Sequence, residues 1–378
     1  MERPTNQPLR GPLQVLLWIA GTRLLAEVAM VLGTYWHRRE PGTWPFQEGS
    51  LFYRQVPIRA LDVWGRWDTD FYLGIARNGY PPLESNPGGW VYHAAYFPLF
   101  PSLMRGLSEL LGGPSLFFTG IFLANAMLVL GVIYVRKLAR LDEGEGLAGV
   151  ATACLLAYPG SHFFSCVYPE STALFLAAFA LYCARTGLAA PAGLACGLAA
   201  VTRSSGALVA LPVLLELCRG EDGRLRPRWR ALWAICPAIT LGLFMLLHLQ
   251  LYRDPIYFVH VQAGWGRRPS FPLEPLFSFN LSLDHHLFAL GAVALVVWGV
   301  VRRQRPSYLW LSGPAVLLPL STGMLRGIHR YMGSNFPLFI FLAKLLRDRP
   351  RWRYAYLGAG LAALALFSFK WGQGFHPN

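Results

Sequence analysis

Charged residues are scarce in this sequence. They make up 14% of its 378 residues, against about a quarter in an ordinary soluble domain. Hydrophobic residues make up 54%, and apolar stretches close to the roughly 20 residues of a spanning helix recur along the chain. The composition therefore excludes a water-soluble globular protein and predicts one integral membrane domain over residues 1–378.

Acidic residues are scarcer than basic ones. The 20 Asp and Glu stand against 34 Lys and Arg, which gives a net charge of +14. In a soluble protein this excess would suggest nucleic acid as a partner, but here the arginines gather in short segments between apolar runs, the pattern of positive-inside topology. We therefore expect membrane lipid, and no nucleic acid, among the partners.

Paired cysteine motifs are missing. The six cysteines include no Cys-x-x-Cys pair, and all lie in or beside apolar runs. This pattern argues against a disulfide framework or a zinc site, and we interpret the cysteines as small packing residues. His285 and His286 are adjacent but have no plausible third ligand nearby in the sequence, so we assign no metal ligands.

Apolar runs dominate what is present. They fall at about 12–36, 115–135, 147–164, 170–186, 188–201, 205–218, 231–252, 286–301, 306–323, 334–346 and 354–370. Lys and Arg cluster in the connecting segments 136–140, 219–230, 302–305 and 344–353. If these segments are cytoplasmic, the amino terminus lies inside and the carboxyl terminus outside. The predicted fold is an all-α polytopic bundle of about eleven transmembrane helices, multi-pass in the plasma (inner) membrane.

This topology makes residues 37–114 one long extracytoplasmic loop and leaves residues 115–378 as the remaining transmembrane bundle. The run from Tyr96 to Leu111 is then a short juxtamembrane or re-entrant helix, which agrees with the prolines at its start. A loop of this length with its own apolar helices is more often functional than idle. We expect the active site on this side.

A polar break separates the two short runs 188–201 and 205–218. It reads Thr202-Arg203-Ser204-Ser205-Gly206, and it predicts two short helices that meet at membrane depth. Irregular backbone survives there only where protein or a wet cavity satisfies its polar groups. In the first run, Arg23 and Glu27 are four positions apart, so they are expected to share a helix face and form an ion pair.

The densest polar signal is residues 66–80 of the outer loop. Trp67, Phe71 and Ile75 recur every four residues, which predicts an interfacial helix with this face on the bilayer surface and a stop at Asn78-Gly79. Asp68 then lies near the helix start, where a carboxylate caps free N–H groups.

Two interpretations of the carboxylates in this segment stay open. In one, Asp68 is only an N-cap and Asp70 a solvated partner of Arg66 or Arg77. In the other, one carboxylate acts as a general base that takes the proton of an attacking hydroxyl.

Several segments carry a family resemblance when they are taken together. They are the Trp67-Asp68 helix closing in Gly79-Tyr80, Tyr96-Phe97-Pro98-Leu99-Phe100-Pro101, Tyr158-Pro159-Gly160-Ser161-His162-Phe163-Phe164 leading to Tyr168-Pro169-Glu170-Ser171, and Thr202-Arg203-Ser204-Ser205-Gly206. In order and spacing they resemble the PIG-V mannosyltransferase family and its bacterial relatives, over roughly the first 220 residues. Beyond these the resemblance thins to Arg330-Tyr331 and Pro337. The sequence departs from the family at Pro169, where relatives commonly have Ser, and at Pro159-Gly160, where they commonly have Asn-Pro.

The resemblance implies a GT-C glycosyltransferase that moves a hexose, mannose in this family, from polyprenyl-phosphate to an acceptor at the extracytoplasmic face. It implies Asp68 as the catalytic base, with inversion at the anomeric carbon, and Asp70 as second choice or partner. The acceptor is a glycan, a glycolipid or a protein. No cofactor is obligatory, and Asp68, Asp70 and Glu170 are the oxygen ligands on offer if a divalent metal is used.

A leaving lipid phosphate calls for arginine, whose guanidinium matches it with a bidentate fork. Arg203 at the polar break is the first candidate, with an interfacial snorkelling arginine as the alternative. His329 and Arg330 are further candidates for the donor phosphate. Weaker candidates are Arg267, Arg268 and Arg326, because solvated charges of an outer loop would show the same sequence pattern.

The predicted substrate-binding set is Glu170, Trp67, Tyr72 and Tyr96. Glu170 follows a proline at the start of a run, so a helix-start role is as well founded as contact with sugar hydroxyls.

Two other classes of function compete with the transferase. A lipid or sugar-lipid transporter or flippase also uses many spans and broken helices, but usually has ionisable residues inside several spans and repeat symmetry. A non-catalytic subunit that presents lipid would keep the aromatic surface without needing the chemistry of Asp68.

Overall fold

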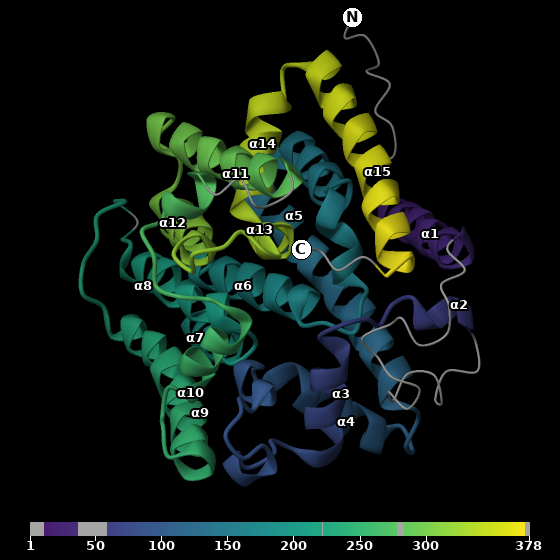
Figure 1. Ribbon diagram of the computed structural model, residues 1–378. Coiled ribbons are helices and arrows are strands. Elements are labelled where there is room, and N and C mark those ends of the chain that lie inside the picture. Colours follow the sequence, from purple (N-terminus) through teal and green to yellow (C-terminus); the bar gives the residue numbers. More distant parts are fainter. Residues whose placement is uncertain (1–10, 37–58, 221, 278–282, 375–378) are drawn as a thin grey trace, which may run out of the picture.

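The computed structural model describes residues 11–36, 59–220, 222–277 and 283–374. Within these ranges the chain is helical, with one isolated bridge between Arg219 and Leu225 and no strand. The α-helices are α1 (Pro12–Trp36), α2 (Arg59–Asp62), α3 (Thr69–Asn78), α4 (Leu99–Leu110), α5 (Leu116–Leu156), α6 (Glu170–Arg185), α7 (Ala189–Ala200), α8 (Ala210–Cys218), α9 (Cys236–Tyr252), α10 (Tyr257–His260), α11 (Leu283–Val301), α12 (Pro306–Leu320), α13 (Ile328–Ser334), α14 (Pro337–Leu346) and α15 (Pro350–Gly372) (Figure 1). The 3₁₀ turns are η1 (Leu83–Ser85), η2 (Tyr92–Ala95), η3 (Pro159–Phe164), η4 (Ser204–Val209), η5 (Trp229–Ile235), η6 (Val261–Trp265) and η7 (Glu274–Phe277).

Helices coincide with every predicted apolar run, which confirms the all-α polytopic fold. Helices long and apolar enough to cross a membrane are α1, α5, the continuous η5–α9 helix Trp229–Tyr252, α11 and α15. The predicted run at 115–135 falls in α5, and the run at 147–164 begins in α5 and continues into η3. α5 is interrupted by non-helical backbone at Glu143 and Gly144. Gly144 has a φ of 79°, a conformation that glycine adopts without steric cost.

The predicted short helix of the outer loop is α4, and its prolines stand where a helix start tolerates them. Pro98 is the N-cap residue and Pro101 lies in the first turn. α4 packs against α3 and α5. Of the predicted loop 37–114, residues 37–58 lie outside the described residues.

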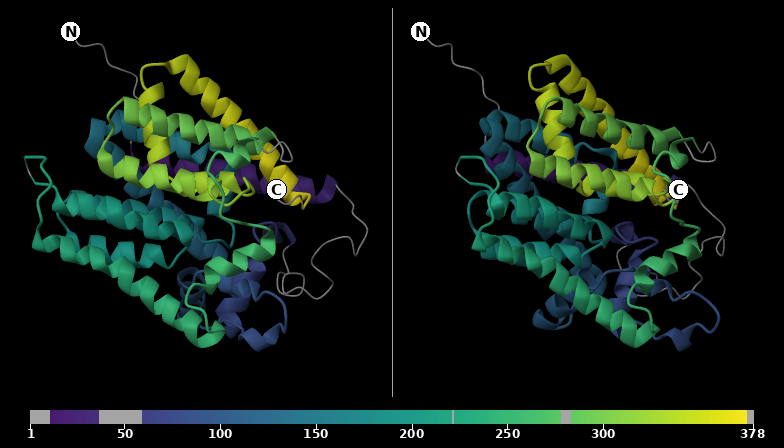
Figure 2. Two further views of the ribbon diagram at one scale, coloured as in Figure 1. Left: turned by 60° about the vertical axis from the view of Figure 1, so that its left-hand side comes forward. Right: turned by 90° about the vertical axis from the view of Figure 1, so that its left-hand side faces the viewer.

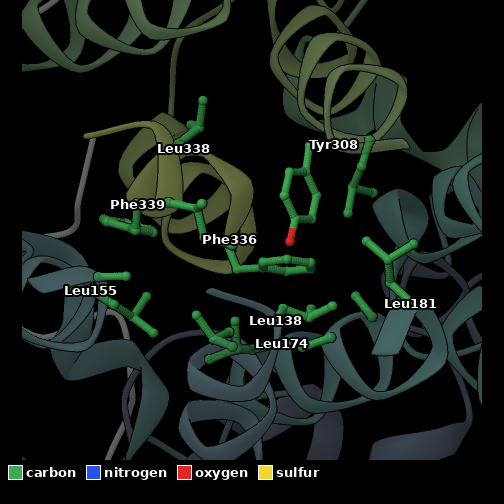
Figure 3. Close-up of a cluster of buried hydrophobic side chains, with 14 of the residues drawn as sticks. Leu138, Leu155, Leu174, Leu181, Tyr308, Phe336, Leu338 and Phe339 are labelled. Atoms are coloured by element: carbon green, nitrogen blue, oxygen red, sulfur yellow. The ribbon is translucent and has the colours of Figure 1, made fainter. Parts of the chain in front are cut away.

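The main hydrophobic core lies where α5, α6, α12 and α14 meet (Figure 3). Residues labelled there are Leu138, Leu155, Leu174, Leu181, Tyr308, Phe336, Leu338 and Phe339, all of them buried. The rings of Tyr308 and Phe336 are nearly perpendicular, with centroids 6.2 Å apart. This edge-to-face contact joins α12 to the start of α14.

Polar contacts of α1 differ from the prediction. Arg23 binds Ser161 rather than the predicted partner Glu27. Its guanidinium donates to the backbone carbonyl of Ser161 and, over 2.8 Å, to the Ser161 hydroxyl. Glu27 hydrogen-bonds the side chain of Trp64. The sequence spacing put both residues on one face, but η3 packs close enough to satisfy Arg23 first.

An ion-pair cluster lies at the end of α6 opposite its first residue, Glu170. The Arg185 guanidinium contacts Asp142 over 2.8 Å, and the Lys344 ammonium lies 3.2 Å from Glu143. The 16 residues of α6 separate this cluster from Glu170 by about 24 Å. Figure 2 shows the segment 59–110, drawn in blue, gathered near one end of the bundle, and the loop after α8 projecting from the other.

Candidate active site

The helix predicted from residues 66–80 is α3, and it ends at Gly79, whose φ is 73°. The prediction that its Trp67-Phe71-Ile75 face lies on the bilayer is wrong for Ile75, which is only 6% exposed. Phe71 stacks on Tyr96 with ring centroids 4.6 Å apart. The loop after α3 folds back over this face, which sequence periodicity alone does not reveal.

A half-open cavity of about 630 Å³ lies beside the start of α3. Its walls are formed by the start of α3 with residues 95–97, the start of α6, the polar break after α7, and the segments 258–269 and 318–331. Predicted residues that line it are Trp67, Asp68, Tyr72, Tyr96, Glu170, Arg203, Arg267, Arg268, Arg326 and Arg330. Asp70 and His329 are not part of this lining.

Asp68 occupies the N-cap position of α3, but its side chain makes no cap hydrogen bond. Its φ and ψ of −64° and −16° are helical, whereas a capping residue needs non-helical backbone. One carboxylate oxygen accepts from the Tyr96 hydroxyl over 3.0 Å and the other from Nη1 of Arg330 over 2.6 Å. The geometry thus removes the capping interpretation.

Arg330 joins Asp68 to Glu170. Its Nε and Nη2 donate to Oε1 of Glu170 over 3.0 and 2.8 Å, and Nη1 of Arg203 lies 3.5 Å from the same oxygen. The Glu170 side chain is only 1% exposed while that of Asp68 is 23% exposed. Asp68 is therefore the carboxylate of this group that a ligand in the cavity can reach.

Asp70 lies two residues further along α3, on another side of the helix. Burial, reinforced by the nearby Asp62, raises the pKa of Asp70 to about 7. In the described part of the chain its Oδ1 is buried without a hydrogen-bond partner. The structure places this second candidate base away from the cavity.

Arg203 projects from the polar break between α7 and η4. Its backbone is extended and its side chain lies over the ring of Tyr331, 4.8 Å from the centroid. Gly206 allows the turn to approach α7, because a Cβ at this position would lie 1.7 Å from the carbonyl oxygen of Ala199. The predicted polar break thus places Arg203 in the wall of the cavity.

His329 precedes Arg330 on α13 but is directed elsewhere. Its side chain is 1% exposed and packs against Phe163 and His285, with ring centroids 5.5 and 5.9 Å apart. Adjacent residues of a helix point about 100° apart, so Arg330 can face the cavity while His329 is buried. The geometry separates His329 from the other predicted phosphate ligands.

The three arginines named as weaker phosphate candidates, Arg267, Arg268 and Arg326, all line the cavity. Nη1 of Arg267 donates to the Tyr331 hydroxyl over 3.1 Å, and interaction with Tyr331 raises the pKa of Arg267. Arg268 pairs with Glu274. Nε of Arg326 is buried with no hydrogen-bond partner among the described residues.

Aromatic side chains complete the walls. Burial and the neighbouring Asp68 raise the pKa of Tyr96, which keeps this hydroxyl protonated as a donor. Tyr72 packs edge-on against Tyr96, with ring centroids 5.1 Å apart. Sequence reasoning missed Trp265, Gln262 and Phe258; the Gly264-Trp265-Gly266 stretch before two arginines was the available signal.

Acidic side chains are few in the lining of the cavity. Within the described ranges, no group of three His, Cys, Asp or Glu side chains is arranged to hold a metal ion. The two carboxylates of the cavity, Asp68 and Glu170, are both engaged by Arg330.

Comparison with known proteins gives similarities of fold only. No protein-family model and no curated protein matches the sequence. Solved structures of an oligosaccharyltransferase from Archaeoglobus fulgidus share 12% identity with it. The form tethered to an acceptor peptide has a TM-score of 0.49, and the match covers 94% of this chain and 55% of that protein. The complex with an inhibitory peptide and a dolichol-phosphate has a TM-score of 0.47, and the match covers 95% of this chain and 55% of that protein. For the apo form the TM-score is 0.45, and the match covers 94% of this chain and 56% of that protein. The chain thus spans little more than half the length of these proteins.

Proposed function

We propose that this protein is a GT-C glycosyltransferase of the multi-pass membrane type. It moves a hexose from a polyprenyl-phosphate to an acceptor hydroxyl at the extracytoplasmic face. The observation that carries the proposal is the Asp68 carboxylate, which is held from both sides by Tyr96 and Arg330 and remains 23% exposed to the cavity. A positioned carboxylate within reach of an acceptor hydroxyl is what a general base requires.

The sugar bond breaks as the acceptor oxygen attacks the anomeric carbon. The acceptor proton passes to Asp68, and the bonding electrons leave with the phosphate of the lipid carrier. The departing phosphate gains negative charge, so cations placed beforehand stabilise the transition state more than the ground state.

We assign this role to Arg267 and Arg326, which line the cavity, in place of Arg203, the first candidate from the sequence. In the described part of the chain neither contacts a carboxylate within 4.0 Å, whereas Arg203 and Arg330 both contact Glu170. Mannose as the sugar follows from the resemblance to the PIG-V family, and so does the assignment of a lipid monophosphate donor.

The test is transfer of radiolabelled mannose from polyprenyl-phosphate by the purified protein, measured for wild type, Asp68→Asn and Asp70→Asn. Loss of a general base is expected to lower the rate of Asp68→Asn by roughly 10²- to 10⁴-fold, while Asp70→Asn keeps most of its activity. Monodisperse elution of each variant controls for folding.

Full activity in Asp68→Asn contradicts the assigned base. If the wild type transfers nothing with several donors and acceptors but moves labelled lipid between leaflets of a vesicle, the protein is a transporter instead.

A further inference from the structure

Tyr168 has no access to the cavity, yet its hydroxyl contacts the backbone on both sides of Trp67. We propose that Tyr168 is a positioning residue that keeps the Asp68 carboxylate turned into the cavity. The inference rests on the proposed function of Asp68 and extends it to a side chain that is 0% exposed.

The backbone before Asp68 has an unusual conformation. Trp67 has a φ of 53° and Asp68 a φ of −64°, and the N–H of Thr69 donates to the carbonyl of Arg66 over 3.2 Å. Trp67 and Asp68 are therefore the central residues of a hydrogen-bonded turn, and the positive φ of Trp67 is a conformation that glycine adopts most readily. A tryptophan there carries a conformational cost that the surrounding structure must offset.

The Tyr168 hydroxyl is the group that offsets it. It donates to the carbonyl of Arg66 over 2.8 Å and accepts from the N–H of Asp68 over 3.2 Å. The two peptide groups that flank Trp67 are therefore bound to one oxygen atom. The chain around Tyr168 is itself held in register, because the N–H of Val167 donates to the carbonyl of Trp64 over 3.0 Å.

This turn determines where the Asp68 side chain points. With helical backbone angles Asp68 cannot cap α3, so its carboxylate is left to bind Tyr96 and Arg330. The Arg330 guanidinium also lies over the Tyr168 ring, 4.5 Å from the centroid. One buried tyrosine thus fixes the base through its hydroxyl and the cationic partner of that base through its ring.

The test is Tyr168→Phe, which keeps the ring and removes the hydroxyl. We expect kcat to fall roughly ten- to hundredfold, because small displacements of a reacting group have effects of this order, while KM for the donor stays within about twofold. Tyr356→Phe is the matched control, since its hydroxyl donates to the carbonyl of Cys154 over 3.2 Å on another part of the bundle. Its kcat should equal that of wild type.

The same substitution in a Trp67→Gly protein tests whether Tyr168 acts through the strained turn at Trp67. Glycine adopts positive φ without steric cost, so Tyr168→Phe should lower kcat less in a Trp67→Gly protein than in the wild-type background. An equal loss in both backgrounds overturns the inference, as does wild-type kcat in Tyr168→Phe when Asp68→Asn is inactive. Unchanged transfer by Asp68→Asn overturns the proposed function instead.

Discussion

Asp68 and Asp70 show how two carboxylates at one helix start acquire different chemistry. Asp68 faces an arginine and a tyrosine hydroxyl across the cavity wall. Asp70 is partly buried and lies near the charge of Asp62, so its pKa is raised to about 7. The difference follows from the angle of about 200° between residues i and i+2 on a helix.

Asp70→Asn is expected to stabilise the protein at high pH. The unfolded chain ionises near its ordinary pKa of about 4, whereas folded Asp70 holds its proton up to about 7. The wild type therefore loses stability as pH rises from about 4 to 7, and the loss is complete above that range. Thermal unfolding in detergent should show little gain for the variant at pH 4 and a Tm raised by about 3 °C or more at pH 8.

Glu84→Gln is the control for this measurement, because Glu84 is an exposed carboxylate of the same loop. A Tm difference for Asp70→Asn that is the same at both pH values would show that ionisation of Asp70 is not its cause.

At the scale of helices, two glycines set the distance between α1 and α15, which lie side by side in Figure 1. A Cβ on Gly33 would lie 2.1 Å from the carbonyl oxygen of Phe369, and one on Gly372 would lie 1.9 Å from that of Met30. Small residues allow this close approach of helix backbones, which is a main source of helix association in membranes. The first and last described helices are thereby packed together.

Gly33→Ala is expected to destabilise the protein by about 1–3 kcal/mol, because the added methyl group forces the helices apart. Gly21→Ala is the matched control on the same helix: nothing lies within 4 Å of its Cβ, and alanine is the better helix former. Thermal unfolding of both variants in one detergent measures the difference. Equal Tm values would contradict the close packing of α1 against α15.

Across the whole molecule, the basic segments meet at the end opposite the cavity. Glu216 accepts from Arg305 over 2.7 Å, the amide of Gln304 binds Lys344, and Arg347 reaches Glu143 over 2.7 Å. Segments far apart in the sequence thus form one basic end. By the positive-inside rule we propose that this end is cytoplasmic and that the cavity opens to the other side.

Single-cysteine labelling in intact cells tests this orientation. In a background lacking the six native cysteines, the exposed positions Asn86 and Asp348 are each replaced by cysteine. A membrane-impermeant maleimide should label Asn86→Cys directly and Asp348→Cys only after permeabilisation. The reverse pattern would invert the proposed topology.

The multi-pass helical fold could be predicted from the sequence alone, because apolar length and helix signals are local properties. The run at 12–36 coincides with α1, and the run at 354–370 lies within α15. The polar break at 202–206 predicts the turn that carries Arg203. The resemblance of the Trp67-Asp68 segment also singled out the carboxylate that the cavity exposes.

Which side chains act together depends on how the helices pack in three dimensions. Asp68 meets Arg330 across 262 residues of sequence and Tyr168 across 100, and no periodicity predicts such pairs. The same packing removed candidates: it buried His329, turned Asp70 away and paired Arg23 with η3 instead of Glu27. Spacing decides which residues share a helix face, but the neighbouring helix decides what that face meets.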